Sequence, residues 1–228
     1  MVTGRAALGS LGLVVLAASG CFDVHAIDPG PAPFVLDDFD DGDVQPNDPN
    51  FDPWECYTIN PQGAPNTCTP RLVSDGSPAL VLDATIVDPA DGLQQHGGAE
   101  LATYARLPKD VSRFSVIVFN AKLQSGNPPI SSDAILSVEI GCRTVPDADG
   151  IVPSRLYVST GVEYGTVWTP SRVSLRNFGW QTWAPPQTDA GPGPCLQKAD
   201  SVRFSVDAAL PDGATGVFHL TVDDITFL

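Results

Sequence analysis

Basic residues are scarce in this sequence. Only 12 Lys and Arg stand against 27 Asp and Glu, so the formal net charge is -15 at pH 7 with neutral His. Nucleic acid and anionic lipid surfaces repel such a chain, and we therefore expect no nucleic-acid partner. Histidine is scarce too: His25, His96 and His219 are scattered, with no pair at the spacing of metal ligands. The excess of carboxylates suits divalent cations instead.

Catalytic motifs are also missing. The sequence contains no Gly-x-Ser-x-Gly elbow and no phosphate-cradling glycine loop. Asp223 and Asp224 resemble a glycosidase pair, but adjacent residues of a strand point to opposite faces and cannot flank one glycosidic bond. The sequence therefore predicts a protein that is not an enzyme, with a glycoside hydrolase or lyase as the weaker alternative.

After residue 20 no apolar run is long enough to span a membrane as a helix. Residues 6–18 form an acid-free apolar run behind Arg5, which is typical of an export signal. The run ends in Leu16-Ala17-Ala18-Ser19-Gly20-Cys21, which resembles the bacterial lipobox, although Ala18 stands where leucine is commonest. We expect a signal peptide over residues 1–20 and a lipidated Cys21; a plain secretory signal before an unmodified cysteine is the alternative.

The predicted anchor sets the expected location. Residues 21–33 would hold the lipidated cysteine and a stiff Pro-rich linker, and residues 34–228 one domain. The lipid would be the protein's only membrane contact. Aspartate after the lipidated cysteine is the inner-membrane retention signal in enteric bacteria, and Phe22 stands there instead. The sequence thus predicts a monomer in the cell envelope, on the outer membrane if the cell has two membranes.

Cysteine is sparse, and the cysteines that follow Cys21 are even in number: Cys56, Cys68, Cys142 and Cys195. An even number in an exported chain indicates disulfides. A turn-rich segment separates Cys56 from Cys68, so a local bridge is easy, and we expect the pairs Cys56–Cys68 and Cys142–Cys195. Zinc is the competing interpretation, but no spacing is C-x2-C.

Helical periodicity is almost absent. Short alternating or apolar runs recur between Gly, Pro, Asn and Asp clusters, a pattern typical of a β-sandwich or barrel. The predicted fold is all-β: a two-sheet antiparallel sandwich. We expect strands near residues 34–39, 79–87, 98–107, 111–122, 134–143, 154–160, 171–176, 201–207 and 216–227.

Strand alternation sorts side chains between the core and the outside. In 134–143 the apolar residues Leu136, Val138, Ile140 and Cys142 share one face, which leaves Glu139 and Arg143 on the other. The same alternation turns Tyr104, Tyr157 and Arg203 outward. We expect one sheet to present a polar face with Tyr and Arg, and an ordinary hydrated sheet surface is the alternative.

Two acidic clusters stand at the ends of the predicted domain. Residues 37–43 read Asp-Asp-Phe-Asp-Asp-Gly-Asp, and Asp223-Asp224 lies in the last strand. Carboxylates at this density repel one another, and a hard cation with oxygen ligands would relieve the repulsion. The sequence therefore predicts calcium, while acids that only cap strand ends in solvent are the alternative.

The same segments carry a family resemblance. Residues 34–43, 167–178 and 216–227 resemble, in this order, the opening strand, a tryptophan-containing strand and the closing strand of galactose-binding-like jelly rolls, particularly CBM11-like and CIA30-like carbohydrate-binding modules. The resemblance implies a jelly roll with a structural calcium between first and last strands, bound by Asp38 or Asp40 and by Asp223 or Asp224. It also implies ligand binding on one sheet face or at rim loops, for which the candidates are Tyr104, Glu139, Arg143, Tyr157, Trp180, Trp183 and Arg203.

Residues and resemblance together predict a non-catalytic lipoprotein of the cell envelope that binds a poly- or oligosaccharide and carries a structural calcium. The alternative from another class is an envelope protein-interaction or assembly lipoprotein without a sugar ligand. It predicts an apolar patch, which Trp180 and Trp183 could form, instead of a groove lined by Tyr104 or Tyr157.

Overall fold

The computed structural model describes residues 30–59, 66–74, 77–88, 96–142, 156–180 and 193–228. The predicted signal peptide, Cys21 and most of the predicted linker lie outside these residues. Within the described part, no helix is long and apolar enough to cross a membrane.

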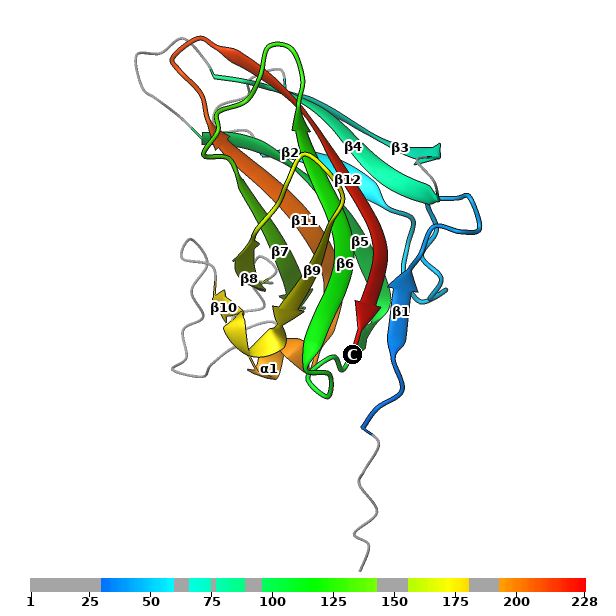
Figure 1. Cartoon of the computed structure of the whole chain (residues 1–228). Helices are drawn as coiled ribbons and strands as arrows, with labels where there is room; N and C mark the ends of the chain where they lie inside the picture. The colour runs from blue at the N-terminus through cyan, green and yellow to red at the C-terminus, as the bar shows by residue number, and fades with distance from the viewer. Residues whose placement is uncertain (1–29, 60–65, 75–76, 89–95, 143–155, 181–192) are drawn as a thin grey trace, which may run out of the picture. The chain divides into compact units, whose positions relative to one another are not determined.

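The described residues form two antiparallel sheets (Figure 1). We name each sheet after one of its central strands. The β12 sheet has the order β3 (Thr67–Ser74), β4 (Pro78–Val87), β12 (Thr215–Phe227), β6 (Val116–Ser125), β9 (Thr169–Ser174), with β1 (Phe34–Asp37) also paired to β12. The β11 sheet has the order β10 (Gly179–Trp180), β8 (Leu156–Val162), β7 (Ile135–Cys142), β11 (Ala199–Ala209), β5 (His96–Lys109), β2 (Glu55–Ile59).

The two sheets bury one apolar core between them. Alternate residues of the central strands supply it, because successive side chains of a strand point to opposite faces. Phe204 of β11 meets Phe119 of β6 edge to face, with ring centroids 4.9 Å apart. Leu136, Val138 and Ile140 are fully buried, as the alternation predicted. The predicted all-β sandwich is confirmed.

Three strands were not predicted: β2, β3 and β10. Each lies at an edge of its sheet. In β2 and β3 exposed and half-buried residues alternate without a fully buried position, and Pro70 interrupts β3. A strand covered on one side only has a weak apolar pattern, which explains why the segment between residues 43 and 79 gave no strand.

Both predicted disulfides are present. Cys56–Cys68 joins β2 to β3, and thus ties an edge of the β11 sheet to an edge of the β12 sheet. Cys142–Cys195 joins the end of β7 to the short helix α1 (Gly193–Leu196), with both residues buried. The Cα atoms of the pairs are 6.1 Å and 5.2 Å apart, within the range of ordinary disulfides.

We predict that the buried bridge stabilises the fold more than the edge bridge does. Their sequence separations are 53 and 12 residues, and the entropy lost on loop closure grows with loop length. Replacing Cys142 and Cys195 by Ala should lower the free energy of unfolding by about 4 kcal/mol, against about 3 kcal/mol for Cys56 and Cys68. Urea unfolding of both double variants measures this, and an unchanged midpoint for Cys142→Ala/Cys195→Ala would contradict it.

Candidate functional site

The outer face of the β11 sheet is built from rows of residues that lie side by side across its strands. One row crosses all six strands of the sheet: Gly179, Ser159, Glu139, Arg203, Ala102 and Glu55. The adjacent row contains Gly161, Ser137, Ser205, Glu100 and Tyr57. Most of these side chains are small, so the glutamates, the arginine and the tyrosine dominate the face chemically.

Arg203 occupies the centre of the outer face between two glutamates. Its Nη1 donates to both carboxylate oxygens of Glu100, at 2.8 Å and 2.7 Å, and its Nη2 donates to Glu139. The exposed fractions of the three side chains are only 8% for Arg203, 12% for Glu100 and 7% for Glu139. Removing a charged group from water costs free energy, and a protein tolerates that cost only when a group of opposite charge lies close by.

The predicted polar face is therefore present, and its centre is buried, unlike the ordinary hydrated sheet surface that was the alternative. Alternation correctly placed Glu139 and Arg203 opposite the core-facing residues. It carried no information on burial, because burial of the three charged groups depends on contacts between β5, β7 and β11 that lie far apart in the sequence. A ligand-contacting role for Glu139 and Arg203 stays a prediction.

An exposed part of the outer face, with an aromatic side chain, lies at its β2 edge. The hydroxyl of Tyr57 donates to Glu55, and the Tyr57 ring meets Tyr104 edge to face, with ring centroids 6.0 Å apart. Tyr57 remains 38% exposed. Two causes raise the pKa of the Tyr57 hydroxyl well above its usual range: the hydrogen bond to Glu55, which is the larger, and burial. We call Glu55, Tyr57 and Tyr104 the tyrosine edge.

The sequence predicted Tyr104 as a ligand-binding residue, but not Glu55 and Tyr57 beside it. Glu55 and Tyr57 lie two residues apart in Glu55–Ile59, where exposed residues alternate with half-buried ones. That alternation was the available signal, but the run is short and carries no strong apolar stripe. The pairing of Tyr57 with Glu100 of β5 puts Tyr57 on the outer face, which the local sequence could not predict.

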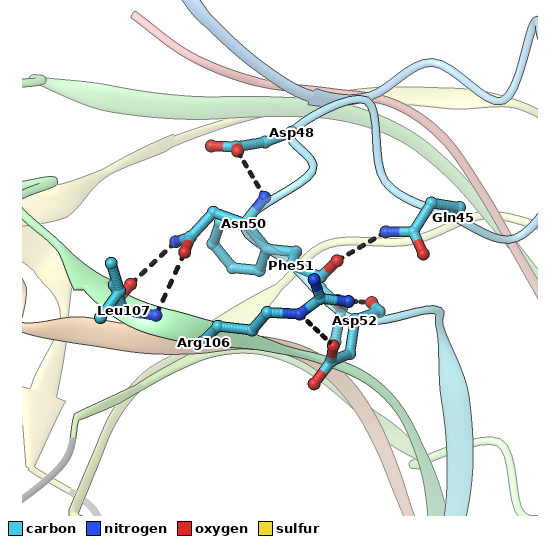
Figure 2. A network of polar contacts seen from close by, with 8 residues as sticks. Gln45, Asp48, Asn50, Phe51, Asp52, Arg106 and Leu107 are labelled. Atoms are coloured by element: carbon cyan, nitrogen blue, oxygen red, sulfur yellow. Dashed lines mark hydrogen bonds and ion pairs between the residues drawn. The ribbon is translucent and has the colours of Figure 1, made fainter.

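The segment before β2 is hydrogen-bonded to the end of β5 through Asn50 and Asp52 (Figure 2). The side-chain amide of Asn50 donates to Leu107 O at 2.8 Å and accepts from Leu107 N at 3.1 Å, as a neighbouring strand would. Arg106 pairs with Asp52 at 2.9 Å. The backbone nitrogen of Asp52 donates to Tyr104 O at 2.8 Å. These bonds hold β5 in place at Tyr104 and at the residues that follow it.

The other predicted ligand-binding residues are only partly described. The backbone of Tyr157 pairs with Gly141, whose row continues through Ser201 to Tyr104. The backbone of Trp180 pairs with Val158, in the row of Ile140. Arg143 and Trp183 lie outside the described residues.

The acidic clusters meet where β1 pairs with β12, as the sequence predicted. Phe34 lies opposite Phe227, and Asp37 lies opposite Ile225. Asp37 is fully buried; it accepts from Trp54 Nε1 at 2.7 Å and from Phe39 N at 2.9 Å. Burial raises the pKa of Asp37 to about 7. This carboxyl group is therefore part of the core.

Two of the four predicted metal ligands, Asp38 and Asp40, closely follow Asp37 in the sequence, and the other two, Asp223 and Asp224, lie in β12, the strand that pairs with β1. Asp223 is buried and accepts from Ser77 Oγ and from Asp224 N, both at 2.9 Å. Burial raises the pKa of Asp223, and the charges of Asp224 and Asp40 raise it further. Asp38 accepts from Asn47, and Asp224 from Asn120.

These contacts bear on whether the β1–β12 junction can bind a metal ion. Among the described residues, no three His, Cys, Asp or Glu side chains form a group that could bind a metal ion. The carboxylates accept from protein donors, so the junction does not present an assembled calcium site. Calcium at Asp38, Asp40, Asp223 and Asp224 stays a prediction.

Comparison with known proteins places the fold. No protein-family model matches the chain, and no curated protein matches it in sequence. Its structure is similar to the family 11 carbohydrate-binding module of a cellulosomal cellulase of Clostridium thermocellum, with a TM-score of 0.54, 17% identity, and coverage of 86% of this chain and 94% of that chain. A family 11 module from the same organism, in complex with a β-1,3-1,4-mixed-linked tetrasaccharide, gives a TM-score of 0.53, 16% identity, and coverage of 86% and 95%. The chain has the jelly-roll fold of these modules.

We predict that Arg203 is essential to the β11 sheet, whereas Arg106 on the same sheet is not. Arg203→Gln leaves two buried glutamates without their counter-charge and should lower the free energy of unfolding by about 3–5 kcal/mol. Arg106→Gln is the matched control, because the Arg106 pair with Asp52 is 63% and 49% exposed and should contribute at most about 1 kcal/mol. Urea denaturation compares the variants, and equal losses would contradict the prediction.

Proposed function

We propose that this protein binds carbohydrate, without catalysis, through the outer face of the β11 sheet. The tyrosine edge is the observation that carries the proposal. It combines an exposed aromatic side chain with a carboxylate acceptor, on a sheet face whose other side chains are mostly small. The jelly-roll fold, shared with modules whose names describe carbohydrate binding, supports the same function.

The chemistry of the face favours an uncharged glycan. Tyrosine rings offer apolar surface to the C–H face of a sugar ring, and carboxylates accept hydrogen bonds from hydroxyl groups. Glu55, Glu100 and Glu139 stand on this face with the positive charge of Arg203 among them. Because negative charge is in excess, an acidic polysaccharide would be repelled.

A hydrolase is the weaker candidate. Glu100 and Glu139 do stand on one face, as a pair of glycosidase carboxylates would. Both are engaged by the same guanidinium and buried, so neither is placed to protonate a leaving group. This arrangement supports binding over hydrolysis.

We also propose that a lipid anchor holds this domain in the cell envelope. A lipidated Cys21 would tether the domain through residues 22–33, and the glycan-binding face would stand clear of the membrane on that linker. The observation behind this part is the lipobox-like segment that ends at Cys21.

We predict that the tyrosine edge is required for binding. Tyr57→Ala and Tyr104→Ala should each weaken retention by soluble β-glucans in affinity electrophoresis by about 5- to 150-fold, the loss expected for about 1–3 kcal/mol of stacking and apolar contact. Trp168→Ala is the control, since Trp168 lies beside β9 of the other sheet, where Lys122 covers its ring. Undiminished retention of both tyrosine variants on every glycan that the wild type binds would refute the proposed face.

We further propose a structural calcium ion at the β1–β12 junction. Two acidic clusters meet there, and the pKa of Asp223 is raised by burial and by neighbouring acids. The two non-glycine residues of the described chain with left-handed backbone, Phe39 and Asp224, also lie there. Such strained conformations gather where a fold serves function. A cation would draw Asp40 and Asp223 together.

Calcium should therefore raise the melting temperature. A ligand present at 100 times its Kd stabilises the folded state by about 2.7 kcal/mol. Thermal melts with calcium and with chelator measure the shift in the wild type, in Asp40→Asn/Asp223→Asn and in the control Asp133→Asn. We expect the shift in the wild type and the control only, and identical wild-type melts in calcium and chelator would remove the ion from the proposal.

A further inference from the structure

A cavity lies at one end of the sandwich, away from the outer face. Its volume is about 420 Å³, at the small end of the range for ligand pockets. The turn between β5 and β6, the 3-10 helix η1 (Leu175–Asn177) and α1 line it. Figure 1 shows α1 at this end, below β8 and β9. We call it the pole cavity.

Backbone hydrogen bonds fix the walls of the pole cavity. Leu175 N donates to Ser115 O at 3.0 Å, which joins η1 to the β5–β6 turn. Val111 N donates to Leu196 O at 2.8 Å, which joins the same turn to α1. Phe114, Leu175 and Leu196 are the buried apolar residues of the cavity wall. The Arg113 guanidinium lies over the Phe114 ring, 5.1 Å from its centroid, so Leu175 and Leu196 form the apolar floor. A cavity held by three elements in this way is preformed.

Two arginines without a counter-charge stand at the rim. Arg113 and Arg176 line the cavity and are exposed, and neither forms an ion pair in the part of the chain that the structure describes. Arg71, Arg106, Lys109 and Arg203 each pair with an acid. In a chain with a net charge of -15, two unpaired guanidinium groups at one cavity are an anion-binding arrangement.

The hydroxyl groups of Ser112 and Ser115 at the rim indicate which further groups a ligand needs. Ser112 Oγ donates to Asp110 at 2.7 Å, and Ser115 Oγ donates to Leu228 O at 3.2 Å. Each hydroxyl has one proton and donates it within the protein, so its oxygen has only acceptor capacity left for a ligand. Asp110 itself does not line the cavity. A ligand that fits must bring an anionic group for the arginines and hydroxyl donors for the serines.

We propose that the pole cavity binds an acidic sugar unit, a uronate. Its carboxylate would lie between Arg113 and Arg176, which recognise carboxylates with paired N–H donors. Its ring hydroxyls would donate to Ser112 and Ser115, and the C–H face of the ring would rest on the apolar floor. The cavity shares no residue with the outer face, so the protein has separate sites for neutral and acidic sugars. The choice of a sugar among hydroxylated anions rests on the proposed function.

The experiment uses the full mature chain. Trigalacturonate is the acidic probe, and galactotriose is its neutral counterpart. Calorimetry should detect trigalacturonate binding that weakens as salt is added, because exposed charges are screened. Arg113→Gln/Arg176→Gln should weaken this binding at least 10-fold. Arg172→Gln, an exposed arginine of β9 outside the cavity, is the matched control and should leave the affinity unchanged.

Chemical-shift mapping on the wild type tests the location without any substitution. Trigalacturonate should move the backbone amide signals of residues 112–115 and 175–176. Three results overturn the proposal: no trigalacturonate binding by the wild type, equal affinity in the folded double-arginine variant, or loss of binding in Tyr57→Ala. Loss of β-glucan retention in Tyr57→Ala with trigalacturonate binding intact supports two sites. Failure of β-glucan binding alone refutes the outer face and leaves the pole cavity standing.

Discussion

A guanidinium held between two carboxylates in the middle of a sheet is tolerated only while all three groups stay paired. Arg203 joins β11 to Glu100 on β5 and to Glu139 on β7, so one side chain links three adjacent strands on the face opposite the core. Desolvation makes any other register expensive, because a one-residue slip would turn these charges into the core and the apolar residues outward. The triad therefore defines the strand register on which the tyrosine edge depends.

The triad also divides the outer face chemically. Its centre is occupied by charges that already satisfy one another, whereas Tyr57 and Glu55 at the β2 edge remain accessible. The edge is held from two directions: the Cys56–Cys68 bridge ties β2 to the other sheet, and the bonds of Asn50 and Asp52 hold the adjoining end of β5. A binding surface at a sheet edge would otherwise be mobile. These constraints make it preorganised, which lowers the entropy lost when a ligand binds.

Alternation and cysteine count were sufficient to predict the sandwich, both disulfides and the faces of β5, β7 and β11. The faces follow from strong apolar stripes, and Cys56–Cys68 joins residues close in sequence. Cys142 and Cys195 are 53 residues apart, and they could be paired because they were the two cysteines that remained. Burial of Glu139 and Arg203 could not be predicted, since it arises from partners more than 60 residues apart. The role of Asp37 was missed for the same reason: its partner Trp54 lies 17 residues away in a segment without a recognised strand.

Separate neutral and acidic sites are consistent with the electrostatics of the whole chain. At a net charge of -15, an anionic ligand gains nothing from long-range attraction, so its binding depends on a local exception. The pole cavity is such an exception, because Arg113 and Arg176 stand where no Asp or Glu lines the wall. At physiological salt the Debye length is about 8 Å, so distant acids are screened, and Asp110, bonded to Ser112 of the wall, is the acid that the two arginines must outweigh. The same screening protects neutral-glycan binding at the outer face, which depends on stacking and hydrogen bonds and should vary little with salt.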